Sequence, residues 1–396
     1  MNSTTHDRDR PTVLTLSTTD WDAPQFGSRQ QIALRLARRG HRVLFVEVPR
    51  ALHSLISDPE ATRRAWKRMG RVRHVPHGPL LYTPLPVLPI YYNPLTNWVN
   101  QRLLLIQLRR VLVRLDWRLD VLWTYWPNTA YLIGRLAERA SVYHCIDDFV
   151  AVGYPLTTRG MIARMEAEQC RKVHVVFART EGLAEAKRLF NANTRLLQGG
   201  VDTSQFDPAH VPEPPPGLAS LPHPRIGFIG TIDDRVNMEL LSRCATTLQY
   251  ATFILIGPVR RHRANTRPLE NLSNVHFLPA VPHSDVPAIM AALDVCLIPY
   301  RISPYTRGLS PIKLYEYLAM AKPVVATDLP YLRREAAHIR IAGTAEGFLA
   351  ALRAALAQPP TEQQQTQWRA TAEAHSWESQ ILEIERHLDA LLGPNP

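Results

Sequence analysis

The chain has 396 residues, more than one hydrophobic core normally organises, so its length predicts two domains. Hydrophobic residues make up 45% of it and charged residues 20%, which excludes an extensively disordered chain. The 46 Lys and Arg residues outnumber the 35 Asp and Glu residues, and the net charge of +11 favours an anionic partner: nucleotide phosphates, nucleic acid or an acidic membrane surface.

Cysteine usage and the N-terminus indicate the compartment. The 4 cysteines form no C-x-x-C pair, so neither a zinc site nor a disulfide framework is indicated, and a reducing environment is expected. The first residues lack the apolar segment of a signal peptide. No stretch reaches the roughly 18 apolar residues of a membrane span. We therefore expect a cytoplasmic protein.

Short β-branched runs alternate with helical patterns through the first half of the chain. Residues 28–39 show one such helical pattern, and Gly40 is expected to end it. Strand, helix and strand in repeated order predict a parallel sheet with helices on both faces. The strand-like runs are 12–17, 42–48, 120–124, 141–146 and 173–178.

A proline-rich segment, 207–224, separates the two halves and is predicted to be an interdomain linker. The alternation then restarts, so a second doubly wound domain is expected. The predicted domains are 11–206 and 225–375, followed by a C-terminal helical element, 376–396, with the option of packing back toward the first domain. The second set of strand-like runs is 225–230, 251–256, 275–278, 295–299 and 323–327.

The most informative stretch is 308–327, which holds two of the only five lysines in the chain. Ser310 suits a helix N-cap and Pro311 the first helical position, and the helix is expected to end at Lys322. A helix N-terminus with Lys313 in its first turn would bind a diphosphate, and Glu316 could accept hydrogen bonds from ribose hydroxyls. The alternative is a capped core helix whose Lys and Glu form a solvated pair.

This stretch resembles the donor-site signature of GT-B glycosyltransferases, especially the retaining family 4 (group 1) and its bacterial surface-polysaccharide relatives. In that family a glutamate of this helix holds the ribose, which implies that role for Glu316. The helix N-terminus and its lysine meet the diphosphate, which implies contacts from Ser310, Pro311, Ile312 and Lys313. The family has a further glutamate eight positions before the ribose glutamate, where this chain has Gly308.

The resemblance implies a GT-B fold, with two Rossmann-like doubly wound domains facing across a cleft. The first domain would bind the acceptor and the second the donor. The expected activity is that of a hexosyltransferase, moving a sugar from a UDP- or GDP-sugar to an acceptor hydroxyl in surface polysaccharide, glycolipid or related glycoconjugate synthesis. No metal and no other cofactor is expected, because no D-x-D motif lies in a donor loop and basic side chains can supply its charge.

Two further parts of the second half resemble donor-site elements of the family. Residues 225–235 resemble its first strand and loop, which implies that Arg235 neutralises the leaving diphosphate, with Thr231 in place of the usual arginine. Tyr300, in the loop after a later strand, is a candidate donor contact. The alternative for Arg235 is an ordinary surface arginine at a helix start.

In the first half, Gly27 and Ser28 precede a helix and are candidates to meet the donor from across the cleft, or else form a simple turn. Asp147 and Asp148 end a predicted strand and could serve as general base or acceptor anchor, with His144 as another proton acceptor. Aspartates also cap helices, which is the alternative for both.

Two basic amphipathic segments, 92–118 and 63–73, suggest contact with the inner face of an anionic membrane and a lipid-linked acceptor. A helix packed on the sheet with a solvated arginine face is the alternative.

Other function classes fit less well. A nucleotide-sugar epimerase or dehydrogenase needs a G-x-G-x-x-G-type loop and commonly a Tyr-x-x-x-Lys pair, which the sequence lacks. No nucleic-acid reader module is present, so nucleic acid is not an expected partner. A nucleotide-sugar-binding homologue without catalysis remains an alternative, because Gly308 replaces a family glutamate.

Overall fold

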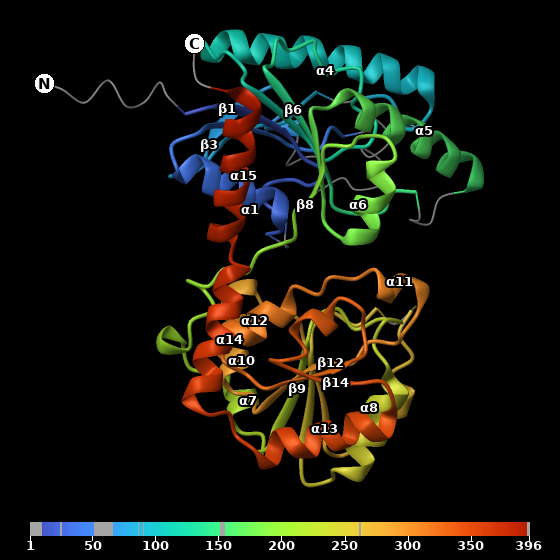
Figure 1. The fold of residues 1–396 in the computed structure, drawn as a ribbon, viewed down its shortest axis with the longest axis vertical. Coiled ribbons are helices and arrows are strands. Elements are labelled where there is room, and N and C mark those ends of the chain that lie inside the picture. The colour runs from blue at the N-terminus through green and yellow to red at the C-terminus, as the bar shows by residue number, and fades with distance from the viewer. Residues whose placement is uncertain are drawn as a thin grey trace, which may run out of the picture. The chain divides into compact units, whose positions relative to one another are not determined.

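The structure is a computed structural model that describes residues 10–23, 26–50, 66–85, 87–89, 91–150, 155–260 and 263–393. The chain forms two compact units. The first contains Met1–Gln198 and Gln380–Pro396, and the second contains Gly199–Ser379. Each unit is built on its own mainly parallel sheet, with helices on both faces (Figure 1).

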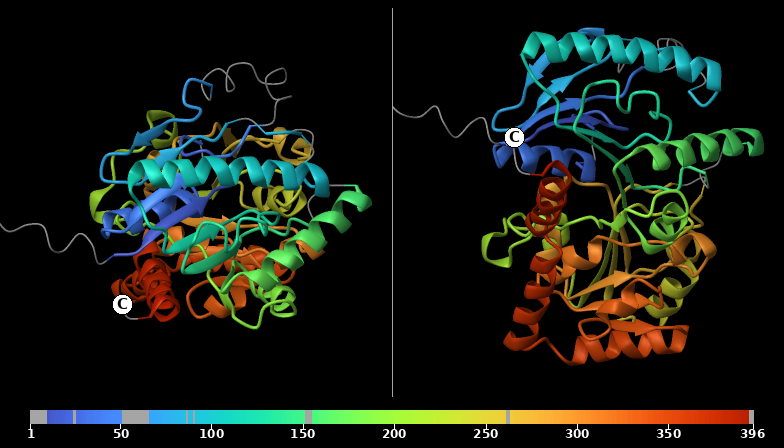
Figure 2. Two further views of the ribbon diagram at one scale, coloured as in Figure 1. Left: turned by 90° about the horizontal axis from the view of Figure 1, so that it is seen from above. Right: turned by 45° about the horizontal axis from the view of Figure 1, so that its top comes forward.

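The first unit has an eight-stranded sheet in the order β3-β4-β2-β1-β5-β6-β7-β8, parallel except between β3 and β4. The long helix α4 packs on one face through buried leucines, and α1 lies on the other face (Figures 1 and 2). The strands are β1 (Thr12–Leu16), β2 (Arg42–Val46), β3 (Val72–His74), β4 (Leu80–Tyr82), β5 (Val121–Thr124), β6 (Ala140–Cys145), β7 (Val175–Ala178) and β8 (Thr194–Leu196). The helices are α1 (Ser28–Arg38), α4 (Pro94–Leu115), α5 (Leu156–Lys172) and α6 (Glu181–Arg188).

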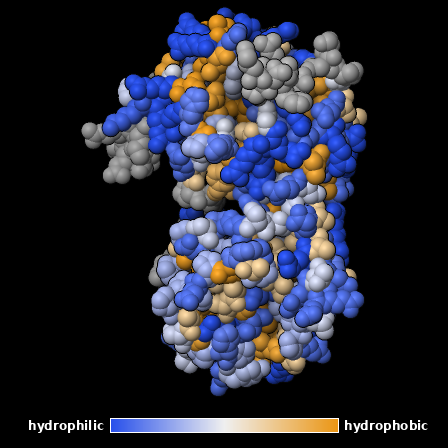
Figure 3. Space-filling model, turned by 90° about the vertical axis from the view of Figure 1, so that its left-hand side faces the viewer, coloured by the Kyte–Doolittle hydropathy of each residue, from blue (hydrophilic) through white to orange (hydrophobic). Residues whose placement is uncertain are grey.

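The outward side of α4 is unusual because it combines apolar and basic residues. Large apolar side chains stand exposed among charged ones on the upper unit in Figure 3. The large apolar residues exposed on α4 are Leu95, Trp98, Leu103, Ile106 and Val113, which are between 44% and 80% exposed. Within the described ranges, every helix is too short or too polar to span a bilayer.

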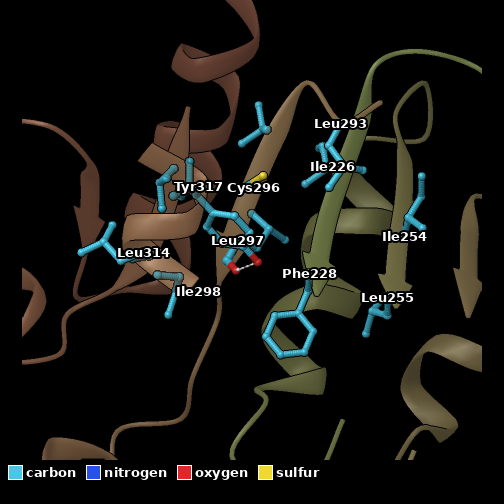
Figure 4. Close-up of a cluster of buried hydrophobic side chains, with 14 of the residues drawn as sticks. Ile226, Phe228, Ile254, Leu255, Leu293, Cys296, Leu297, Ile298, Leu314 and Tyr317 are labelled. Carbon is cyan, nitrogen blue, oxygen red and sulfur yellow. Dashed lines mark hydrogen bonds between the residues drawn. The ribbon is translucent and has the colours of Figure 1, made fainter. Parts of the chain in front are cut away.

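The second unit has a six-stranded parallel sheet in the order β11-β10-β9-β12-β13-β14. Its core joins the strands to α12, whose Tyr317 hydroxyl donates to the carbonyl oxygen of Leu297 at 3.4 Å (Figure 4). The strands are β9 (Arg225–Ile229), β10 (Thr252–Ile256), β11 (Val275–Leu278), β12 (Val295–Ile298), β13 (Val324–Thr327) and β14 (Arg340–Ala342). The α-helices are α7 (Pro216–Ala219), α8 (Met238–Thr247), α9 (Arg267–Glu270), α10 (Val286–Ala291), α11 (Pro304–Arg307), α12 (Lys313–Ala319), α13 (Ala345–Ala357), α14 (Glu362–Ala374) and α15 (Trp377–Leu392), the last of which runs into the first unit.

Strand order predicts where a ligand crevice lies in each unit. In the second unit the chain builds outward from β9 in both directions, to β10 and β11 on one side and to β12, β13 and β14 on the other. In the first unit β1 and β5 flank the corresponding reversal. Ligands of doubly wound sheets bind at the carboxyl ends of strands beside such a reversal.

All the strand-like runs expected from the sequence form strands, and the doubly wound fold class is confirmed. The end of α1 also follows expectation. Gly40 has φ +93°, and the N–H of His41 donates to the carbonyl oxygen of Leu36 at 3.0 Å, which closes a Schellman motif.

The proline-rich segment differs from expectation, because it does not link the units. Residues 207–224 lie inside the second unit, and Phe206 and Leu218, each 1% exposed, belong to its core. The guanidinium of Arg225 donates to the carbonyl oxygens of Ala219 and Leu221 at 2.8 and 2.9 Å, which fixes the segment's end. The chain instead passes between the units at Gln198–Gly199 and at Ser379–Gln380.

The predicted C-terminal element, 376–396, contains one helix, α15, and residues from Gln380 onward belong to the first unit. Glu385 of α15 explains how the helix is held there. Its carboxylate lies 2.6 Å from Arg39 and 3.0 Å from His41, both at the end of α1. Burial alone would raise the pKa of Glu385, but hydrogen bonds from Arg39 and His41 lower it.

Candidate functional site

The loop after β9 lies at the predicted crevice of the second unit and would form its floor. Its backbone is bonded to the ends of both neighbouring strands: Ile232 N–H donates to Pro258 at 3.0 Å, and Asn237 N–H donates to Pro299 at 2.8 Å. Gly257 has φ +139°, and a Cβ there would lie 2.2 Å from the carbonyl oxygen of Gly230. Only glycine permits this close approach, which keeps the strand end free of side chains.

Lys313 extends over this floor from the first position of α12. Its Nζ lies 4.0 Å from the ring centroid of Phe228 and 5.1 Å from that of Tyr300. A Cβ on Gly230, which has φ +145°, would be 2.7 Å from Nζ, so the ammonium rests against bare backbone. Among the described residues no carboxylate lies within ion-pairing distance of Lys313. A half-buried cation with only aromatic neighbours is suited to receive an anionic ligand.

Glu316 lies one turn further along α12, with its side chain 15% exposed. Its Oε1 faces Nε2 of His283 at 3.5 Å, and His283 lies on the turn after β11. Interaction with Glu316 raises the pKa of His283, although burial opposes the shift. His283 is not among the residues predicted from the sequence, because it lies on a separate turn and only its position after a strand could have indicated it.

The predicted helix start is wrong by two residues. The N-cap of α12 is Ile312, not Ser310, and no side chain caps the helix. The N–H of Leu314 donates to the carbonyl oxygen of Pro311 at 3.1 Å, so Pro311 belongs to a turn that precedes the helix. The contacts proposed for Ser310, Pro311 and Ile312 with a diphosphate remain predictions. Because α12 is short, we expect the Lys313 side chain to contribute more to diphosphate binding than the helix N-terminus does.

Arg235 is placed at the crevice, but its charge is already paired. Its Nε and second guanidinium nitrogen donate to Asp233 at 2.8 and 2.7 Å, and Asp233 is only 4% exposed. Burial alone would raise the pKa of Asp233, but the hydrogen bonds from Arg235 lower it. The neighbouring Asp-Asp-Arg sequence could have revealed this pair. Thr231 is half-buried in the same loop. Tyr300 is 5% exposed, and its ring contacts the ammonium of Lys313.

Gly308 adopts an ordinary backbone conformation, so the fold does not require glycine there. A Cβ would meet only the carbonyl oxygen of Tyr305, at 3.6 Å. The departure from the resembling family's glutamate is therefore not forced by the backbone.

Among the predicted residues of the first unit, the structure brings those at the start of α1 close to those at the end of β6. Gly27 caps α1, Ser28 begins it, and the next residue, Arg29, has a guanidinium nitrogen 3.6 Å from Asp147. The Asp147 side chain is 57% exposed, whereas the carboxylate of Asp148 accepts the N–H of Val150 at 3.1 Å.

His144 does not have the surroundings of an accessible base. It is 2% exposed within an aromatic cluster, with its ring centroid 5.0 Å from that of Tyr125 and 5.8 Å from that of Trp123. Burial, followed by the charges of Arg179 and Arg29, lowers the pKa of His144 to about 3. Its imidazole is therefore neutral at physiological pH.

Comparison with known proteins finds a family match within the second unit. The family described as glycosyl transferases group 1 matches residues 223–358. The chain is 34% identical over 106 residues to TuaH, a proposed teichuronic acid biosynthesis glycosyltransferase of Bacillus subtilis (strain 168). That match covers 26% of this chain and 27% of TuaH.

Solved structures resemble nearly the whole chain at low sequence identity. Sucrose-phosphate synthase from Thermosynechococcus elongatus has a TM-score of 0.67 at 17% identity, covering 96% of this chain and 99% of its own. HepE of Anabaena, in complex with UDP, has a TM-score of 0.64 at 15% identity, and the match covers 96% of this chain and 100% of HepE. The chain therefore has the GT-B fold, and within it residues 223–358 are similar to the glycosyl transferases group 1 family.

Proposed function

We propose that the protein is a hexosyltransferase that moves a sugar from a nucleotide-diphosphate sugar to an acceptor hydroxyl. The observation that carries this proposal is the ammonium of Lys313 over Phe228 and Gly230, one helical turn from Glu316 and paired with no carboxylate of the described residues. The name of TuaH supports a role in surface polysaccharide or related glycoconjugate synthesis, and the UDP in HepE supports a UDP-sugar as donor.

The proposed roles follow from the charges of the crevice. Lys313 would neutralise the diphosphate as the bond from the anomeric carbon to the phosphate oxygen breaks, with Thr231 and Gly230 offering close backbone approach. Glu316 would accept the ribose hydroxyls. The acceptor oxygen would bond to the anomeric carbon and lose its proton to a base, for which exposed Asp147 is a better candidate than Asp148 or His144. The donor contacts proposed for Gly27, Ser28, Arg235 and Tyr300 also remain predictions.

Glu316→Gln is expected to weaken UDP binding about tenfold, because hydrogen bonds to a charged group are worth roughly 1.5–3 kcal/mol and the amide keeps only one acceptor oxygen. Isothermal titration calorimetry with UDP, GDP, ADP and NAD would measure this effect and identify the nucleobase of the donor. The matched control is Glu213→Gln, an exposed glutamate of the same unit.

Each alternative function gives a different result. Binding of NAD alone would support an epimerase or dehydrogenase. UDP binding without release of UDP from any UDP-sugar, tested with added acceptors, would support a binding homologue without catalysis. Equal UDP affinity of wild type and Glu316→Gln would contradict the assigned donor site.

We also propose that α4 brings the enzyme to the inner face of an anionic membrane, where a lipid-linked acceptor would be found. The helix carries no acidic residue, and its exposed side combines the apolar residues named above with Arg102, Arg109, Arg110 and Arg114. An open groove at its C-terminal end is also rich in arginine, including Arg42 and Arg118. Such a surface fits the interface of an anionic bilayer.

In the other predicted basic segment, part of the charge is already paired. Residues 63–65 of the segment 63–73 lie outside the described residues. Arg68 pairs with Asp22, and Arg73 pairs with Glu47 at 3.0 Å. Their charges are satisfied within the first unit.

The triple change Arg102→Gln, Arg110→Gln, Arg114→Gln is expected to weaken binding to phosphatidylglycerol vesicles at least tenfold, since each basic residue near the surface contributes about 1 kcal/mol. Cosedimentation at low and high salt would measure it. The control is Arg243→Gln, Arg353→Gln, Arg369→Gln, which removes the same charge from exposed sites of the second unit. An equal loss of vesicle binding in both triple variants would show that net charge alone causes the effect, and it would contradict a membrane-binding surface on α4.

A further inference from the structure

His283 lies between Glu316 of α12 and Phe206, which belongs to the core of the second unit. Its Nε2 faces Oε1 of Glu316 at 3.5 Å, and its other face meets the ring of Phe206 edge-on, with centroids 5.5 Å apart. His283 is about half-exposed and lies in the short 3-10 turn His283–Asp285 after β11. Nothing in the proposed donor chemistry yet uses this imidazole.

Gln205 fixes how the imidazole presents its proton. Its amide nitrogen donates to the carbonyl oxygen of His283 at 2.6 Å and lies 3.1 Å from Nδ1. A carbonyl oxygen only accepts, so the group facing it is the amide N–H₂, which has no acceptor capacity. Nδ1 must then accept, and the proton of the neutral ring sits on Nε2, toward Glu316.

The consequence is that His283 offers an N–H to Glu316 in both of its charge states. The neutral ring does so through this tautomer, and the protonated ring does so with an added charge. The acidic groups that act on His283 are Glu316 and, at longer range, Asp202, and both favour its protonated form. Each carboxylate oxygen of Glu316 can accept two hydrogen bonds, so one held oxygen still allows two sugar hydroxyls to be bound.

We infer that Gln205 and His283 are positioning residues that hold the Glu316 carboxylate so that it selects ribonucleoside over 2′-deoxyribonucleoside diphosphates. This inference rests on the proposed function, since it takes Glu316 as the ribose acceptor. Because His283 already restricts the Glu316 side chain, binding the two vicinal hydroxyls costs less side-chain conformational entropy. Without His283 the carboxylate would turn toward solvent and contact the ribose less well.

Calorimetry with UDP and 2′-deoxy-UDP tests the inference. Wild type is expected to bind UDP roughly tenfold more tightly than 2′-deoxy-UDP, because one hydrogen bond to a charged group is lost. His283→Ala is expected to bring this ratio to about two, with affinity for inorganic pyrophosphate unchanged. Added to Glu316→Gln, His283→Ala is expected to cause no further loss, because both changes remove the same contact.

His276→Ala is the matched control, since His276 lies on β11 of the same unit and no hydrogen bond or ion pair involves its ring among the described residues. Gln205→Ala is a second test variant, expected to lower the UDP to 2′-deoxy-UDP ratio in the same direction. An unchanged ratio in His283→Ala and Gln205→Ala, with wild type selecting UDP, would overturn the inference and leave the proposed function standing. Failure of wild type to bind UDP at all would instead refute the proposed function.

Discussion

Replacing Lys313 with methionine is expected to lower kcat/KM for the nucleotide-sugar donor about 10²- to 10³-fold, or roughly 3–4 kcal/mol of transition-state stabilisation. Methionine keeps the apolar contact with Phe228 and Tyr300, so the floor of the crevice stays packed. What it removes is the charge that opposes the departing diphosphate. The loss should therefore appear with UDP and pyrophosphate but hardly with uridine.

Lys322→Met is the informative control, because the same change is made at the other end of the same segment. The ammonium of Lys322 donates to the carbonyl oxygens of Ala291 and Leu293 at 2.7 and 2.8 Å, so it holds the core together. Burial lowers the pKa of Lys322. Lys322→Met should therefore lower the unfolding temperature, while the folded enzyme keeps its affinity for UDP. If uridine and UDP binding fell equally in Lys313→Met, the diphosphate role of Lys313 would be refuted.

The sequence predicted the sheets well because their strands are buried on both faces. Runs such as Val13–Leu16 and Val295–Ile298 are continuous and β-branched, which distinguishes them from amphipathic helices. The missed strands, β3, β4, β8 and β14, have only three residues each, too few to show a period. The prolines in 207–224 predict a linker, and that prediction is wrong because composition alone does not reveal that Phe206 and Leu218 are buried.

The candidate site was predictable only where one residue carried an unusual signal. Lys313 stood out in a chain that otherwise uses arginine, and its placement at the crevice fits that signal. The N-cap role of Ser310 failed because the turn at Pro311 and Ile312 takes over the start of α12. The His283–Glu316 contact joins the turn after β11 to α12, and only tertiary structure brings such residues together.

Replacing Lys187 with methionine is expected to reduce the free energy of unfolding of the first unit by about 3–5 kcal/mol. Lys187 of α6 and Glu166 of α5 form an ion pair at 2.7 Å, with side chains only 8% and 3% exposed. The hydroxyl of Tyr143 donates to the other carboxylate oxygen of Glu166 at 2.6 Å. Without Lys187 the carboxylate remains buried and must either lose its charge or draw in water. Urea unfolding followed by circular dichroism would measure the loss.

Burial, and not distance, decides the size of this effect. Lys172 and Glu168 of α5 lie 2.6 Å apart, no further than the buried pair, but their side chains are 42% and 56% exposed. Lys172→Met should therefore cost less than about 1 kcal/mol, since water solvates both groups before and after the change. The double change Glu166→Met, Lys187→Leu should recover most of the stability lost in Lys187→Met, because it also removes the stranded carboxylate. If Lys172→Met and Lys187→Met destabilised the unit equally, the buried pair would have no special role in its stability.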